Sequence, residues 1–208
     1  MNPLPQTDAQ QKSRAHLELT LQTRTVMDFA VAGLGLQYGT VRLVRADDAW
    51  STIGRALAAE ISEGLADVAR AVEHVGSTAV PGLLTKPIID LAIAMRPGTA
   101  VDDVVGRMSR LGWIYRGDAG DEGGWIFVME DSPWHRVAHA HGVEFGGSQW
   151  VQYLQFRDLL RRSAAARRIY EEAKQHLAQQ HPDGRRRYTA GKDTTVQRLL
   201  LDIIDSTP

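Results

Sequence analysis

The chain has 208 residues with 24 basic and 25 acidic side chains, so its formal net charge is close to zero. Such a chain, without a basic stripe, has no general attraction to nucleic acid or to an anionic membrane. The absence of cysteine excludes disulfides, thiol catalysis and thiolate metal sites. The first residues are polar, unlike a signal peptide, and no apolar run approaches the ~20 residues of a membrane span. We therefore expect a cytoplasmic protein with neither a nucleic-acid nor a membrane partner.

The first forty residues are expected to form an N-terminal extension, 1–40, ahead of a domain at 41–208. Residues 1–14 are polar, Gln-rich and contain two prolines, a composition typical of disorder. The segment from Ala15 to Val31 carries a helical pattern, which the three glycines of AGLGLQYG end. Nothing in this segment indicates its role.

Helical and strand patterns alternate from residue 41 to 147. Asp47 or Asp48 precedes a run with apolar residues at helical spacing and is a good N-cap for it. PIIDLAIAM is almost continuously apolar, as expected of a buried central strand. The patterns predict strands at 41–44, 72–76, 87–95, 113–117, 125–130 and 136–145, and a loop at 118–124. They predict helices at 52–69 and 97–112, the second capped by Thr99 or a neighbour.

The C-terminal third is predicted to be helical. Its patterns indicate helices at 151–163, 164–180 and 193–205, with a basic turn at 184–192. A mixed sheet flanked by helices, followed by this helical third, places the chain in the α+β class. The apolar run from Leu199 to Ile204 packs either internally or against a second copy, so a homodimer is open.

The stretch HVGSTAVPGLLTKPIID joins a strand to the predicted central strand. Its Gly76-Ser77 turn would let backbone N–H groups and a hydroxyl approach a phosphate, and Lys86 would add positive charge. Asp90 lies near the start of a buried strand, where a carboxylate needs a partner or an ion, and it could hold Mg²⁺ against the same phosphate. Alternatively, Gly-Ser is an ordinary turn and Asp90 a strand-start acid.

Histidines and basic residues supply the other candidates. Period two places His139 and His141 on one face of a strand, where they could bind a metal or phosphate, act as acid and base, or be bonded to neighbours. Basic side chains further along the chain could bind a triphosphate. Alternatively, they form the solvated face of a helix. The candidates here are Arg116, Lys174, Tyr188 and Lys192.

Several blocks resemble the GrpB-like (glutamate-rich protein B) family: EHVGSTAVPGLLTKPIIDLAIAM, LGWIYRGDAG, HAHGVEFGGSQW, LQFRDLLR and the spaced Tyr170, Lys174, Tyr188 and Lys192. The resemblance runs from about Val41 to Leu200. That family is placed in the nucleotidyltransferase superfamily and also occurs fused to dephospho-CoA kinase. The resemblance implies a nucleotidyltransferase-like mixed sheet flanked by helices. It also implies that Gly76 and Ser77 hold nucleotide phosphates and that Asp90 is the first metal-binding carboxylate.

The chain departs from the superfamily motif at its second acid, because that position holds Ala92. Two-metal nucleotidyl transfer needs at least two carboxylates, and no third acid is obvious either. Three interpretations stay open. Histidines replace acids, so that Asp90, His139 and His141 form one divalent-metal site; Glu144 or Asp118 supplies an acid; or transfer chemistry is lost.

The first function expected is a metal-dependent transferase that uses a nucleoside triphosphate and Mg²⁺ or another divalent metal on a small-molecule acceptor. His139 or His141 would be a ligand or base, while Arg116, Lys174 and Lys192 would neutralise charge on the phosphates. The alternative is a non-catalytic module that binds a nucleotide or CoA-related phosphate. A third candidate is a hydrolase built on the Asp-His-His set.

Overall fold

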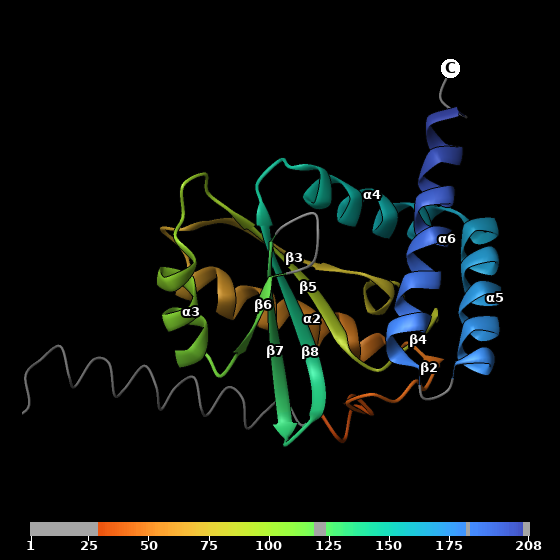
Figure 1. Ribbon diagram of the computed structural model, residues 1–208, viewed down its shortest axis with the longest axis horizontal. Coiled ribbons are helices and arrows are strands. Elements are labelled where there is room, and N and C mark those ends of the chain that lie inside the picture. Colours follow the sequence, from red (N-terminus) through yellow and green to blue (C-terminus); the bar gives the residue numbers. More distant parts are fainter. Residues whose placement is uncertain (1–28, 119–123, 182–183, 206–208) are drawn as a thin grey trace, which may run out of the picture.

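The computed structural model describes residues 29–118, 124–181 and 184–205. Its main element is a mixed six-stranded sheet in the order β3-β5-β8-β7-β6, with β1 paired to β8 (Figure 1). The strand bounds are β1 Leu36–Gln37, β3 Ala69–Val75, β5 Ile89–Met95, β6 Ile114–Asp118, β7 Trp125–Ser132 and β8 His135–Glu144. The β5–β8 pair is parallel and the other pairs are antiparallel. A separate two-stranded ribbon consists of β2 Val44–Arg45 and β4 Leu84–Thr85.

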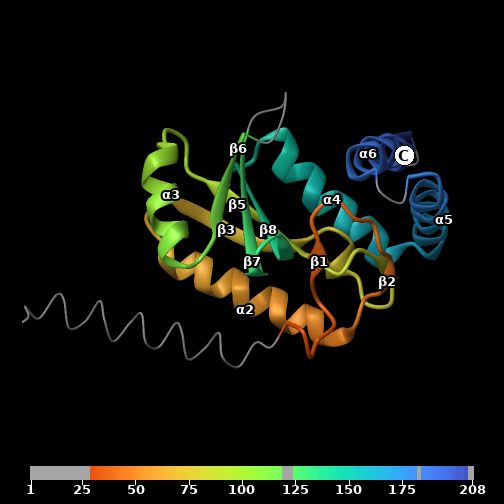
Figure 2. The same cartoon turned by 60° about the horizontal axis from the view of Figure 1, so that its bottom comes forward.

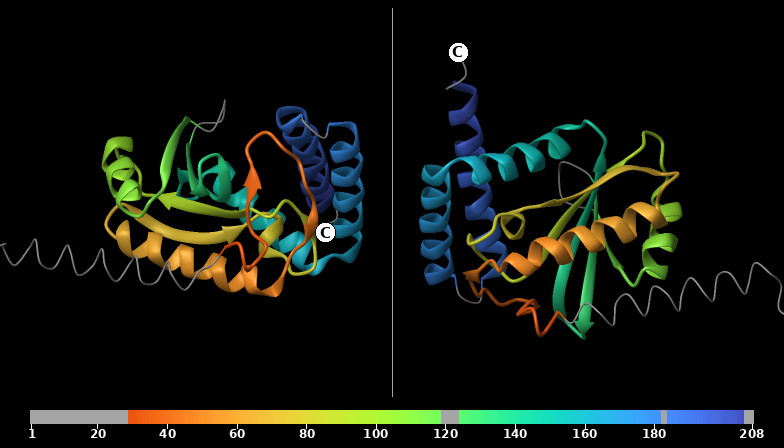
Figure 3. Two further views of the ribbon diagram at one scale, coloured as in Figure 1. Left: turned by 90° about the horizontal axis from the view of Figure 1, so that it is seen from below. Right: turned by 180° about the vertical axis from the view of Figure 1, so that it is seen from behind.

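Helices flank both faces of the sheet, and a pair of long helices stands beside it (Figure 2). Their bounds are α2 Asp48–Gly64, α3 Val101–Arg110, α4 Ser148–Arg162, α5 Ala164–Gln180 and α6 Arg185–Asp205, with a short 3₁₀ turn, η1, at Ser77–Ala79. Seen from below, α2 and α3 lie on one side of the sheet, and α5 and α6 lie beyond its end (Figure 3, left). The predicted α+β fold with a helical C-terminal third is therefore confirmed.

The alternation of β5 divides the core between the two faces. Leu91 and Ile93 pack in a large cluster with Leu57 and Ile61 of α2, while Ala92 faces the other way and contacts a smaller cluster around α4. A third cluster joins α4, α5 and α6 to the segment around Val80 and Leu83. Since β5 is apolar on both faces, the single polar side chain Asp90 is exceptional in this strand.

Most predicted elements exist, with corrected ends. The helix at 164–180 has the predicted bounds, and Asp47 caps α2 by accepting from the Ala49 N–H at 2.8 Å. However, α2 ends at Gly64 rather than Ala69, which instead begins β3. Thr99 does not cap α3, because its hydroxyl donates to the Arg96 carbonyl at 2.8 Å.

The predicted basic turn at 184–192 is wrong, because α6 begins at Arg185 and continues through Gly191. That glycine lets α6 approach α5, since a Cβ there would lie 2.4 Å from Leu177 Cδ2. The glycine-rich segment 32–39, expected only to end a helix, contains β1. Gly35 in this segment also accompanies close packing, because a Cβ there would lie 2.1 Å from His135 Cε1.

Several predictions fall outside the described residues. These are the disordered start at 1–14, nearly all of the helix at 15–31, and most of the loop at 118–124. Residues 29–33 form a turn. Leu199 is buried against α4 and α5 while Leu201 is 60% exposed, so the question of a second copy stays open. Within the described ranges, no helix combines the length and apolarity needed to cross a membrane.

Replacing each of two helical glycines by alanine should change the stability of the fold in opposite directions. A Cβ at Gly54 would lie 2.3 Å from the Nδ1 atom of buried His74, whereas at Gly106 the nearest atom is the tip of Arg110 at 4.0 Å. Gly54→Ala should destabilise the fold by about 1–3 kcal/mol through overpacking. Gly106→Ala should stabilise it by about 0.5–1 kcal/mol through helix propensity. Urea unfolding measures both, and equal signs would refute this account of the α2–β3 contact.

Candidate functional site

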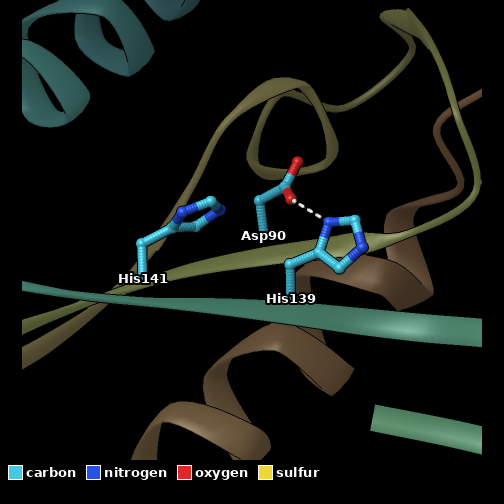
Figure 4. Close-up of side chains that lie close together, drawn as sticks. All are labelled: Asp90, His139 and His141. Atoms are coloured by element: carbon cyan, nitrogen blue, oxygen red, sulfur yellow. Dashed lines mark hydrogen bonds and ion pairs between the residues drawn. The ribbon is translucent and has the colours of Figure 1, made fainter. Parts of the chain in front are cut away.

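Two parallel strands bring an acid and two histidines together. Asp90 of β5 pairs in register with His139 of β8, and Ala92 with His141, so the three polar side chains leave the same face (Figure 4). His139 Nδ1 donates to Asp90 Oδ1 at 3.3 Å. One ligand atom from each of Asp90, His139 and His141 lies within 4.8 Å of the others. This set is called the Asp-His-His cluster below.

The Gly76-Ser77 turn lies against Asp90. Gly76 has φ 67°, and a Cβ there would come within 2.9 Å of Asp90 Oδ2, so both backbone conformation and space require glycine. Thr78 fixes the turn from the other side, because its hydroxyl oxygen accepts from the Asp90 N–H at 3.4 Å and shares a hydrogen bond of 3.0 Å with His74 Nε2. The turn is therefore held in place over the carboxylate.

One basic side chain of α5 contacts the same turn, and a second basic side chain lies over a tyrosine of α6. The ammonium of Lys174 donates to Ser77 Oγ at 3.3 Å and to the Leu84 carbonyl, and it lies 4.2 Å from the centre of the Tyr170 ring. Lys86 lies over the ring of Tyr188 at 5.1 Å. These contacts place Lys174 against the turn and join Lys86 to α6.

Burial and charge set the protonation of the cluster. Burial alone would raise the pKa of Asp90, but the hydrogen bond and charge of His139, with His141 and Lys192, outweigh it and hold the pKa below its usual range. Burial lowers the pKa of His141 to about 4, against the attraction of Asp90. At neutral pH the carboxylate is thus ionised and His141 is neutral, so both have lone pairs for a metal.

Burial also lowers the pKa of Lys174 to about 7, and the positive charge of Lys192 acts in the same direction. Lys192 keeps 30% of its side chain exposed. Asp90 retains 34% exposure of its side chain, so a ligand from solvent can reach it. The candidate site therefore combines a reachable carboxylate with a nearly buried, weakly basic lysine.

Arg116, predicted to bind phosphate, is not brought into this group. It lies on β6, separated from β5 by β8 and β7, where it donates to Glu130 at 3.1 Å and stacks over Trp134 at 5.6 Å. Glu144 pairs with Met95 five residues along β8 from His139, roughly 16 Å away at strand spacing. Asp118 ends β6 at the far side of the sheet. Neither acid replaces the missing one.

The structure also adds residues to the site that the site prediction omitted. Tyr170 hydrogen-bonds Ser77, His74 supports Thr78, and the ring of Tyr153 lies 5.4 Å from that of His141. Tyr170 and Lys174 are four residues apart on α5, as are Tyr188 and Lys192 on α6. This repeated spacing was the available signal, because residues four apart share a helix face.

The chain is similar in sequence to proteins of a known family. The family model described as GrpB protein matches residues 40–201. A UPF0157 protein of Pseudomonas aeruginosa is 37% identical over 162 residues, covering 77% of this chain and 66% of the relative. The UPF0157 protein YqkA of Bacillus subtilis is 35% identical over 127 residues, covering 61% of this chain and 36% of YqkA.

A solved structure shares the fold. The crystal structure of conserved protein GrpB from Enterococcus faecalis matches with a TM-score of 0.67 and 30% identity, over 78% of this chain and 99% of that one. The fold and site describe an α+β protein whose mixed sheet carries an Asp-His-His cluster beside a Gly-Ser turn. The chain belongs to the GrpB family. It spans just under two thirds of the Pseudomonas relative and about a third of YqkA.

Acid should destabilise this site before it reaches the ordinary carboxyl range. Burial lowers the pKa of His141 and of His74 from 6.5 to about 4. Between those pH values the unfolded chain binds protons that the native state does not, so stability falls as pH falls, by up to about 1.4 kcal/mol per pH unit for each histidine.

Chemical unfolding at several pH values between about 7 and 4 tests this pH dependence. His141→Gln should reduce the slope, while the exposed-residue control His176→Gln should keep it. An unchanged slope in His141→Gln would show that this imidazole titrates normally.

Proposed function

We propose that this protein is a metal-dependent transferase that moves a nucleotidyl or related phosphate-activated group from a nucleoside triphosphate to a small-molecule acceptor. The observation that carries the proposal is the convergence of Asp90, His139 and His141 beside the Gly76-Ser77 turn. The nucleotidyltransferase superfamily, in which the GrpB family is placed, uses a turn and a carboxylate in this relation. The family assignment supports the fold of this site, and the geometry of the side chains supports its chemistry.

The donor set suits one divalent ion. Asp90 would supply one carboxylate oxygen to the ion, and His139 and His141 would each supply one imidazole nitrogen. Imidazole donors favour transition metals such as Zn²⁺, whereas Mg²⁺ prefers oxygen ligands. The neutral state of His141 and the ionised state of Asp90 both fit this role. When bound, the ion would neutralise charge on the phosphates.

The register explains how histidine could replace the second acid. His141 lies opposite Ala92, the position that the superfamily motif gives to that acid. Ala92 is fully buried and small, and the imidazole beside it supplies a donor from the neighbouring strand. A histidine whose pKa is about 4 is a weak base, so His141 is better suited to be a ligand than to accept a proton from the acceptor.

The turn and the lysines provide the phosphate site. Gly76 lies against Asp90, and Lys174 donates to the Ser77 hydroxyl. In this proposal the backbone N–H groups after Gly76 and that hydroxyl would bind the phosphates. The charge of Lys192 acts on Asp90, His141 and Lys174, which supports a role for Lys192 in binding the phosphates. In nucleotidyl transfer, an acceptor hydroxyl would attack the α-phosphate, and pyrophosphate would leave as the α–β bridging bond breaks.

The second candidate is a non-catalytic module that binds a nucleotide or CoA-related phosphate. The specific observation in its favour is that Asp90 is the single carboxylate in the cluster found among the described residues. A two-metal mechanism needs at least two carboxylates. Release of pyrophosphate from nucleoside triphosphates with Mn²⁺, measured across an acceptor library, separates the two candidates. Metal-dependent nucleotide binding with no release from any acceptor favours the module.

Metal binding should depend on the whole cluster. Isothermal titration calorimetry should show that Mn²⁺ or Zn²⁺ binds the wild type more tightly than Mg²⁺. Asp90→Asn and His141→Gln should each weaken binding at least about tenfold, because each removes a ligand. Glu144→Gln is the matched control, since it removes an exposed acid from the same strand. Wild-type affinity in Asp90→Asn would rule out the metal site.

Nucleotide binding should weaken as pH rises through about 7, because Lys174 loses its charge there. Lys174→Met should abolish this dependence. Lys192→Met should lower affinity at every pH and move the midpoint upward, since removing a neighbouring cation makes protonation of Lys174 easier. Titration of a triphosphate across this pH range checks the result, and a flat profile for the wild type would contradict it.

A further inference from the structure

A groove lies along the edge of β3, between α2 and α4, whose ribbons enclose this strand in Figure 3, right. Its volume is about 530 Å³, which is within the range of small-molecule sites. The walls are Arg55 of α2 and Arg157 and Arg161 of α4, with His74 and Glu73 of β3 between them. The metal site proposed above uses none of these side chains as ligands.

Positive charge in this groove exceeds the carboxylates that line it. Arg157 is satisfied, because it donates to Glu73 and Asp158, each at 2.8 Å. Arg161 donates to the Ala79 carbonyl through Nε and Nη2, and its Nη1 lies 3.7 Å from Asp158. Within the described ranges, Arg55 donates to the Thr52 hydroxyl at 3.1 Å and has no carboxylate partner. Two guanidinium groups therefore retain N–H donors for a ligand.

The three arginines all affect the pKa of the same histidine, His74. Burial is the main cause that lowers the pKa of His74 to about 4, and Arg161, Arg157 and Arg55 all lower it further. Burial and the charge of Arg157 also lower the pKa of Arg161. Arg157 and Arg161 of α4 thus repel one another, and Arg55 of α2 acts on the same histidine as they do. An anion in the groove would offset this excess of positive charge.

We propose that the groove between α2, β3 and α4 binds a small multivalent oxyanion of the phosphate-ester or polyphosphate class, separately from the Asp-His-His cluster. Arg55 and Arg161 hold it from opposite walls. One guanidinium group can donate two parallel charge-assisted hydrogen bonds to two oxygens of a phosphate. The hydroxyl groups of Ser51 and Ser62 lie in the same lining and supply further donors. The site needs no metal, because its charges come from side chains.

The probe is inorganic pyrophosphate, titrated by calorimetry into the full-length chain in EDTA. Lys192→Met serves as the background, because it removes a cation of the other phosphate site. In this background, binding should persist with one pyrophosphate per chain and weaken as salt is added. Adding Arg55→Gln should weaken it at least about tenfold, since one charge-assisted contact is lost. Arg198→Gln removes an equal charge at an exposed position of α6 and should leave the affinity for pyrophosphate unchanged.

Arg55 is exposed, and its described contact is a single hydroxyl of its own helix, so its substitution leaves the core intact. Equal thermal unfolding of the variants verifies this point. Loss of all pyrophosphate binding in Lys192→Met, or equal binding with and without Arg55, would overturn the groove proposal. Neither result bears on Asp90, because the titration contains no free metal. Failure of the groove and failure of the transferase proposal are thus distinguishable.

Discussion

The parallel pairing of β5 with β8 is the constraint on which the candidate site depends. It sets Asp90 beside His139 and Ala92 beside His141, and period two then turns the three polar side chains to one face. A slip of one residue would turn the histidines into the cluster that packs on α2, where they would replace Ala138 and Ala140. The apolar contacts on that face therefore hold the register, and the register holds the site.

The protonation states of Asp90 and Lys174 follow from how far each side chain is buried and from the charges near it. An isolated carboxylate within an apolar strand would cost several kcal/mol. Asp90 avoids this cost through the His139 hydrogen bond, through nearby cations and through its remaining exposure. Lys174 has no carboxylate within ion-pair distance in the described part of the chain, and its pKa falls to about 7. The surroundings thus stabilise the charged form of Asp90 and disfavour the charged form of Lys174. A bound phosphate would stabilise the charged lysine.

Much of the site could be predicted because its signals are local. The acid inside PIIDLAIAM breaks an apolar run, and the alternation of HRVAHAHGVE places both histidines on one face. What the sequence could not supply was the alignment of strands separated by 49 residues, which the tertiary contacts of α2 and α3 decide. For the same reason the sequence could not show that Arg116 lies away from the cluster, on the strand at the other end of the sheet. Gly191 misled the helix prediction because its packing against Leu177 is also a tertiary property.

The turn at residues 76–79 is shared by two chemically different surroundings. On one side Lys174 binds the Ser77 hydroxyl, and Gly76 lies against Asp90. On the other, Arg161 holds the Ala79 carbonyl and Arg157 the His74 carbonyl, while the His74 ring bonds Thr78. A short backbone turn held from both sides has few ways to adjust to one ligand without moving the contacts of the other. Arg161 of the groove and Lys174 of the candidate site therefore contact the two ends of the same three-residue turn, Ser77–Ala79.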